Sequence, residues 1–328
     1  MSLDFPKQKL DVNGQIQKLE KAGVQFELYS KEKAARFLTC NTYLFKIKSY
    51  LKNYPRDSRD GLYHHVDFAY LVELSTLDMH FRNLVLRLCL SIEHQLKVTL
   101  MRDFSNNPKE DGYSIIQEFF EENPRIRAEM EHRRVYESEE LMEKYFPNLP
   151  IWVFLEVCTF GSFTRLLTFY YRKYPTRRSE SLLRLVYSVR CLRNAAAHNN
   201  CLLNSLRHPY ERSHPFRPNR DLVVFLRSHG FSKASLERKM SNPLAHDFTA
   251  ALRLFSQICQ SPGLYQAVLR DFQDLFKGRF LRHADYFASY PFLTSYYEFS
   301  IKVIDLFSQE GYLVPTEQKE FSFSGDGH

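Results

Sequence analysis

A short stretch near the middle of the chain carries side chains that could act together on a phosphodiester. Residues 188–202 read SVRCLRNAAAHNNCL. Positions i, i+3, i+4, i+7 and i+8 of this stretch share one face of a helix and hold Arg190, Arg193, Asn194, Ala197 and His198. The other face offers an apolar seam for the core: Leu185, Val189, Leu192 and Ala196. The spacing therefore predicts a helix with one polar stripe, whose alanines leave room for a ligand or another chain segment.

The side chains of this stripe suit the cleavage of RNA. An imidazole titrates close to neutral pH and moves protons, whereas a guanidinium stays charged and binds phosphate. Cleavage requires a base for the ribose 2′-hydroxyl, an acid for the leaving 5′-oxygen, and positive charge beside the phosphorane. The amide of Asn194 can hydrogen-bond the imidazole of His198 or a substrate oxygen. This scheme needs no metal and no cofactor. The alternative is a helix whose Arg193 and His198 pair with acidic neighbours.

Basic residues surround the stripe. The chain has a formal net charge of +7. Between Thr164 and Arg220, twelve basic residues stand against two acidic ones, so this part carries +10 and the remainder −3. Eleven of the twelve are arginines, whose planar fork suits phosphate, and RNA is the expected partner. The expected substrate-binding residues are Arg190, Arg207, Arg212, Arg217 and Arg220. The alternative is charge scattered over solvated helical faces.

The elements that must position the stripe read as helices. Eleven glycines and 14 prolines, the latter mostly between periodic segments, indicate an all-α fold with short connections. Helices are predicted over residues 14–24, 30–53, 65–104 (as two helices with a break near 75–77), 125–144, 161–174, 180–206 and most of 243–310. Residues 207–220 read as an exposed basic loop, and the tail FSFSGDGH reads as disordered.

Several classes of protein are disfavoured by the sequence. The six cysteines form no C-x-x-C pair and no cluster with zinc-ligand spacing, which argues against a disulfide framework and a structural zinc. The first residues lack an apolar signal core, and no apolar run approaches the roughly 20 residues that span a bilayer. No G-x-G-x-x-G, Walker A or H-E-x-x-H motif is present. A cytoplasmic protein without a membrane segment is therefore expected.

Three segments carry a family resemblance. The run Arg193-Asn194-Ala195-Ala196-Ala197-His198 resembles the R-x-x-x-x-H signature of HEPN ribonucleases. Residues 68–97, with Asp78, Arg82, Ile92-Glu93 and Leu96-Lys97, and the block L-P-I-W at 149–152 followed by F-G-S at 160–162, are similar to the abortive-infection Abi family, the AbiD/AbiF-like proteins. Together with the opening helices, the resemblance covers most of residues 10–206.

The resemblance implies a fold and an activity. It implies a multi-helix HEPN-like bundle with additional helices at both ends: an N-terminal helical region (1–60), an Abi core (61–206), a basic loop region (207–242) and a C-terminal helical region with a disordered tail (243–328). It also implies a metal-independent endoribonuclease of phage defence that leaves a 2′,3′-cyclic phosphate. Arg193 and His198 would be catalytic and Asn194 would assist. Because such enzymes pair two motifs and this chain offers one, a homodimer is implied, with an antitoxin or activating partner left open.

Two further residues are expected to support the site. Arg82 and Glu93 are eleven residues apart and project in nearly the same direction on a helix, where a carboxylate could orient Arg193. The alternative is an intrahelical pair between Glu93 and Lys97. A rival function is a non-catalytic Abi-family RNA-binding or protein-interaction module. An open groove around His198 would favour catalysis, and a sealed, fully paired imidazole would favour the module.

Overall fold

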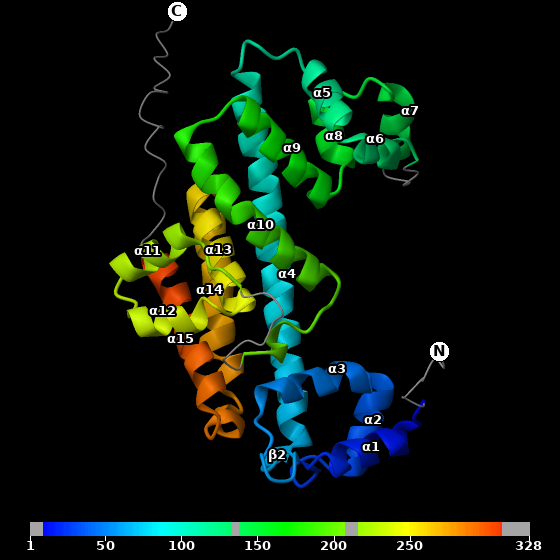
Figure 1. Cartoon of the computed structure of the whole chain (residues 1–328), viewed down its shortest axis with the longest axis vertical. Coiled ribbons are helices and arrows are strands. Elements are labelled where there is room, and N and C mark those ends of the chain that lie inside the picture. The colour runs from blue at the N-terminus through cyan, green and yellow to red at the C-terminus, as the bar shows by residue number, and fades with distance from the viewer. Residues whose placement is uncertain (1–8, 133–137, 207–215, 310–328) are drawn as a thin grey trace, which may run out of the picture.

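The computed structural model describes residues 9–132, 138–206 and 216–309. Within these ranges the chain forms fifteen α-helices, a few 3₁₀ turns and one two-stranded sheet, so the predicted all-α fold is confirmed. Figure 1 shows the arrangement around the long helix α4: helices α1 to α3 gather at one end of it, α5 to α9 at the other, and α13 to α15 along its side. Within the described ranges, no helix is both long and apolar enough to span a bilayer.

The N-terminal helices are fastened to the start of α4. Helices α1 (Val12–Lys21), α2 (Lys31–Cys40) and α3 (Leu44–Ser49) precede a 3₁₀ turn, Tyr50–Asn53. Strand β1 (Val24–Gln25) pairs in parallel with β2 (Val66–Asp67). The Asp67 carboxylate accepts hydrogen bonds from the Glu27 and Ala69 backbone N–H groups, both at 2.8 Å, and thereby caps α4. The single helix predicted over 30–53 is wrong, because the chain leaves the helical conformation between Cys40 and Leu44.

Helix α4 (Phe68–Ser105) runs without a break for 38 residues, about 57 Å at the usual rise per residue. The break predicted near 75–77 is wrong. Leu74 and Leu77 are both buried, and the Thr76 hydroxyl donates to the Val72 carbonyl at 2.9 Å. Packing of the two leucines therefore keeps the chain helical at Ser75 and Thr76, which are weak helix formers.

Helix α10 (Arg177–Ala197) carries the predicted polar stripe and packs against α4, α9 and α13. It begins with a capping box between Thr176 and Ser179. The predicted apolar seam is confirmed, because all four of its residues are buried: Leu185, Val189, Leu192 and Ala196. The helix ends at Ala197 rather than 206, since Asn199 takes the left-handed conformation (φ 58°) and turns the chain into the 3₁₀ segment η3, Leu202–Asn204.

A group of helices at the far end of α4 corrects two further expectations. Its members are α5 (Ser114–Glu122), α6 (Pro124–Glu131), α7 (Glu139–Tyr145), α8 (Ile151–Val157) and α9 (Phe160–Lys173). The solvated helix predicted over 125–144 is instead divided into α6 and α7, which bury Ile126, Met130 and Met142. Helix α5 was not predicted, although Ile115, Ile116, Phe119 and Phe120 recur at helical spacing and are buried.

The C-terminal third packs along α4 and α10. It comprises α11 (Arg220–Ser228), α12 (Lys233–Lys239), α13 (Pro243–Ile258), α14 (Pro262–Lys277) and α15 (Pro291–Gln309), with 3₁₀ turns η4 (Arg279–Leu281) and η5 (Ala284–Phe287). The helices predicted after 243 are confirmed. The loop region predicted over 207–242 is corrected by α11 and α12, which form because Leu222, Leu226 and Leu236 are buried. Residues 207–215 and the predicted disordered tail lie outside the described residues.

Candidate functional site

Arg193 lies in a partly buried position between three helices. Its guanidinium Nη2 is 3.7 Å from the Glu93 carboxylate on α4, and its central carbon is 5.7 Å from the centre of the Phe160 ring on α9. The Arg193 side chain is 27% exposed and that of Glu93 is 14% exposed. The buried Nε of Arg193 and Oε2 of Glu93 have no hydrogen-bond partner, so the pair is held by charge without a hydrogen bond. The structure therefore brings Glu93 to Arg193 and leaves donor capacity on the guanidinium.

Glu93 faces a second cation on its own helix. The ammonium of Lys97 is 3.9 Å from Glu93 Oε1, so the two contacts weighed for this carboxylate, with Arg193 and with Lys97, coexist. One carboxylate between two cations leaves the cluster with a net charge of +1. Beneath it, burial raises the pKa of the Cys89 thiol, although the nearby Arg193 acts in the opposite direction. A net positive, partly desolvated cluster is suited to an anion such as phosphate.

His198 ends α10 at the surface. Its backbone N–H donates to the Asn194 carbonyl at 2.9 Å, and its side chain is exposed. Among the described residues the imidazole has no hydrogen-bond or ion-pair partner. It borders a hollow of about 660 Å³ between α3, the end of α10 and the start of α13, to which Lys46 and Asp247 also contribute. The imidazole is thus open to solvent, not sealed in the core.

Arg193 and His198 point to different places within one chain. The hollow at His198 does not include Arg193, which faces Glu93 and Phe160 instead. Asn194 is exposed, and its side-chain oxygen accepts a hydrogen bond from Arg193 Nη1 at 3.4 Å. The amide therefore contacts the guanidinium and not the imidazole.

A buried charge network fixes the chain that follows His198. The Asp78 carboxylate on α4 is wholly buried and forms an ion pair with Arg82. Its other partners are the Tyr50 hydroxyl (3.0 Å) and the Leu203 N–H (2.7 Å). Arg82 also reaches the Asn200 carbonyl at 3.3 Å. Burial raises the pKa of Asp78, and the Leu203 N–H and Arg82 oppose that rise. Arg82, expected to support the site beside Glu93, does not lie beside Arg193 but contacts the backbone two residues after His198.

The part of the chain that holds these groups corresponds to a known family. A family model described as Abi-like protein matches residues 36–204, more than half of the 328 residues. The chain belongs to the Abi-like protein family. The matched range contains Asp78, Arg82, Glu93, Arg193 and His198, and it ends within η3. Membership suggests a function related to abortive infection. No curated protein and no solved structure matches the chain.

Arg190 of this Abi-like protein lies in a second hollow, of about 400 Å³, between α9 and α10. Its guanidinium is 5.1 Å from the centre of the exposed Tyr187 ring and 3.5 Å from the Thr164 hydroxyl. Arg165 and Arg172 also border this hollow, and Arg172 is paired with Glu122. Of the other expected substrate-binding residues, Arg217 and Arg220 are exposed. Arg207 and Arg212 lie outside the described residues.

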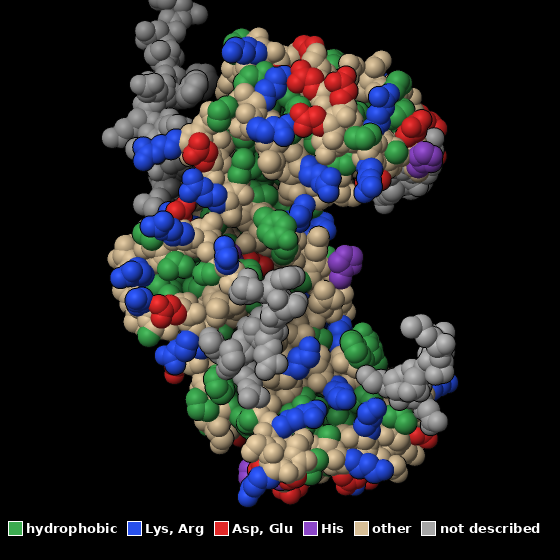
Figure 2. All heavy atoms as spheres, viewed as in Figure 1, with side chains coloured by type: hydrophobic (Ala, Val, Ile, Leu, Met, Phe, Trp, Pro, Cys, Tyr) green, Lys and Arg blue, Asp and Glu red, His purple; other side chains and the backbone are tan. Residues whose placement is uncertain are grey.

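Two aromatic residues near His198 in the Abi-like protein were not predicted from the sequence. Tyr43 and Phe45 border the hollow at His198 and are 59% and 83% exposed. In the run Y-L-F-K-I-K at 43–48, two aromatic residues directly precede two lysines, and this pattern could have indicated a surface for nucleic acid. Figure 2 shows this side of the molecule hollowed between the N-terminal helices and the α5 to α9 group, with Lys and Arg side chains on both borders.

Within the described ranges, no group of three or more His, Cys, Asp or Glu side chains is placed to hold a metal ion. Cys191 and Cys201, which flank the end of α10, are free and half-buried. Burial raises the pKa of Cys191, and a hydrogen bond with Tyr187 lowers it in part.

Proposed function

We propose that this Abi-like protein is a HEPN-type endoribonuclease in which His198 moves protons and Arg193 binds the scissile phosphate. The observation that carries the proposal is the open position of His198. An imidazole that is open to solvent, and has no hydrogen-bond partner among the described residues, can exchange a proton with a bound substrate, whereas one sealed in the core cannot reach a substrate. The open imidazole favours catalysis over the role of a purely structural module.

The proposed reaction needs only the chain and the RNA. A histidine removes the proton of a ribose 2′-hydroxyl, and the 2′-oxygen attacks the adjacent phosphorus. The bond from phosphorus to the 5′-oxygen breaks, a protonated group gives that oxygen a proton, and a 2′,3′-cyclic phosphate and a 5′-hydroxyl result. Arg193 stabilises the negative charge of the phosphorane. Glu93 keeps the guanidinium in place without using its full hydrogen-bonding capacity.

The working site is proposed to lie between two copies of the chain. One imidazole cannot act as base and acid at once, and Arg193 and His198 point to different places in a single chain. A two-fold arrangement would bring the end of α10 from each copy to a common cleft. The small, exposed Ala197 next to His198 permits such an approach. Bound RNA would offset the repulsion between two basic surfaces and so strengthen the dimer.

The surroundings of His198 favour an unpaired RNA strand. Tyr43 and Phe45 present aromatic faces to solvent beside the imidazole, and Lys46 adds positive charge. Exposed rings beside basic groups stack unpaired bases whatever their identity. Arg190, stacked near Tyr187, extends basic and aromatic surface along α10. A strand that runs along this helix would pass both hollows.

One observation favours a second candidate, an RNA-binding module without catalysis. Glu93 and Asn194 both engage the Arg193 guanidinium, as in a structural ion pair. In that case the helix would present the stripe for binding alone. RNA would then be held and not cut.

Cleavage by purified variants tests the proposal. We expect His198→Ala and Arg193→Ala to remain folded, because both side chains lie off the buried seam, and to lose cleavage at least a hundredfold. The matched control is His94→Ala, which removes an exposed histidine from α4. Product ends should be cyclic phosphates, and excess chelator should leave the rate unchanged.

Two results would contradict the proposal. A folded His198→Ala protein that cleaves at the wild-type rate would refute the acid–base role. Mixing wild-type subunits with excess His198→Ala subunits tests the shared cleft. Activity should fall with the square of the wild-type fraction, and a fall in simple proportion would show that each chain holds a complete site.

A further inference from the structure

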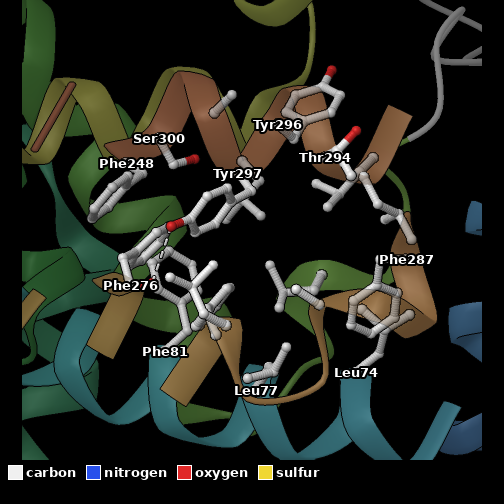
Figure 3. Close-up of a pocket in the computed structure, with 18 residues that line it drawn as sticks. Leu74, Leu77, Phe81, Phe248, Phe276, Phe287, Thr294, Tyr296, Tyr297 and Ser300 are labelled. Carbon is white, nitrogen blue, oxygen red and sulfur yellow. Dashed lines mark hydrogen bonds between the residues drawn. The ribbon is translucent and has the colours of Figure 1, made fainter. Parts of the chain in front are cut away.

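A cavity of about 110 Å³ lies between α4, α13, α14 and α15, in a region that the proposed function does not use. Its walls are formed by eighteen residues, none of them charged. Figure 3 shows Leu77 and Phe81 from α4 on one side and Tyr297 and Ser300 from α15 on the opposite side, with open space between them. The space is partly open to solvent, but most of its apolar lining is buried, so a physical reason must keep the walls from closing on one another.

Rigid rings hold the walls apart. Phe276 is stacked on Phe280 with ring centres 4.4 Å apart, and Phe81 meets Phe248 edge to face at 5.1 Å. The Tyr297 hydroxyl donates to the Phe276 carbonyl at 3.2 Å, which fixes its ring against α14. Because these rings pack against one another, none of them can rotate into the space without breaking one of these contacts. The cavity is therefore a preformed feature of the fold.

The lining defines the chemistry of an occupant. The space is open to solvent on one side, and an ion that entered it would lose hydration without gaining a charged partner among the lining residues. Apolar cavities of roughly 150 Å³ accept a benzene molecule. Thr294, Tyr296 and Ser300 come from α15, but Figure 3 shows the Tyr296 hydroxyl directed away from the space and the Thr294 hydroxyl donates to the Pro291 carbonyl at 3.2 Å, so the lining is mainly apolar. Exposed Leu281 and Ala284, in η4 and η5, mark the side nearest to solvent.

We propose that this cavity is a binding site for a small neutral apolar molecule, of the size of one aromatic ring or a short alkyl chain. Entry occurs between η4, η5 and the first turns of α15. Hydrophobic burial supplies the affinity.

The site is connected to the chain that follows His198. Leu203 and Leu206 line the cavity, and their backbone N–H groups are held by Asp78 and Asn53, each at 2.7 Å. Leu244 lines both this cavity and the hollow at His198. An occupant therefore packs directly against the segment that shapes the hollow. The binding site does not depend on the proposed function. Only an effect of the bound molecule on RNA cleavage would depend on that function.

Toluene, with 1-hexanol as a chain-like probe, tests the site on the full-length protein. Saturation-transfer NMR should show saturable binding of at least one of the two, and the melting temperature should rise with its concentration. Ser300→Phe fills the cavity and should weaken binding at least tenfold. The matched control Ser308→Phe, two turns further along α15 and outside the cavity, should bind as the wild type does. Should Ser300→Phe not fold, Thr294→Leu replaces it.

The outcomes separate the two proposals. Absence of saturable binding for both probes, or wild-type affinity in the folded cavity-filling variant, would overturn the site. Amide exchange at Leu203 and Leu206 should slow when the probe is bound, and unchanged exchange at saturation would overturn the connection to the His198 segment. These readouts do not depend on cleavage, so a protein that binds toluene yet never cuts RNA refutes the ribonuclease and leaves the cavity site standing.

Discussion

Replacing Asp78 with asparagine should destabilise the protein far more than the loss of one surface ion pair. The carboxylate is wholly buried, and the side chain of its partner Arg82 is only 10% exposed. Asparagine keeps the volume and still offers an oxygen to the Leu203 N–H, so the main loss is the charge that balances Arg82. Breaking a buried ion pair by removing one partner costs about 3–5 kcal/mol. That is a large share of the roughly 5–15 kcal/mol by which most domains are stable.

A double substitution separates the charge effect from the packing effect. In Asp78→Asn combined with Arg82→Met, no unbalanced charge remains, and the lost contact to the Asn200 carbonyl accounts for about 1 kcal/mol. The double variant should therefore be more stable than Asp78→Asn alone. The surface control is Glu122→Gln, which breaks the exposed pair with Arg172 and should cost less than about 1 kcal/mol.

Urea unfolding at pH 7, followed by far-ultraviolet circular dichroism, measures five proteins: the wild type, Asp78→Asn, Arg82→Met, the double variant and Glu122→Gln. An Asp78→Asn variant that loses less than about 1 kcal/mol would refute the view that Arg82 depends on this carboxylate. A double variant whose loss equals the sum of the single losses would refute the coupling between them. Either result would remove the argument that this network fixes the backbone after His198.

Two further predictions concern other parts of the molecule. Phe45→Ala should weaken binding of unpaired RNA about tenfold or more in a fluorescence anisotropy titration, whereas the exposed control Phe292→Ala should have no effect; equal affinities would refute base stacking at α3. Burial lowers the pKa of Lys239 to about 8, so the unfolded state binds more protons above that pH and stability should rise between pH 8 and 10, by at most about 3 kcal/mol. Urea titrations of Lys239→Met should lack this rise, and an identical rise in the variant would refute the assignment.

Local patterns in the sequence predicted α10 well and its end poorly. The buried seam from Leu185 to Ala196 follows from helical spacing alone, because one helix carries the whole signal. The end at Ala197 depends on the left-handed conformation of Asn199, and the next residues are held by contacts with α4. Apolar residues such as Leu202 and Leu203 continue the helical spacing of the sequence, so a prediction from periodicity places the end of the helix too late.

The errors elsewhere have the same origin. Ser75 and Thr76 weaken α4 locally, but burial of Leu74 and Leu77 on both sides outweighs that preference. In α11, the arginines and a preceding proline make the segment look like a loop, although Leu222 and Leu226 have helical spacing and are buried in the structure. In both cases tertiary contacts determine whether the segment is helical, and these contacts cannot be read from a single sequence.

The candidate site divides in a similar way. Arg193 and His198 are found from spacing because they lie on one helix. The neighbour of Arg193, Glu93, is a hundred residues away in the sequence, and it was predicted from its helical spacing to Arg82 within a segment that is similar to the Abi family. The aromatic pair at Tyr43 and Phe45 reaches His198 only because the turn after α3 packs against η3, so its role was not predicted.

Helix α4 determines how these separate parts are placed relative to one another. It carries Glu93, which contacts Arg193, and Arg82, which holds the backbone next to His198. Eleven residues separate the two, about 17 Å along an unbroken helix, so the spacing between the contacts is set by one rigid element. Phe81, beside Arg82 on α4, lines the apolar cavity. A change that moves α10 along α4 must therefore alter the Arg193 contact and the chain segment after His198 together, whereas the cavity, which is also lined by α13 and α15, can change without such a movement.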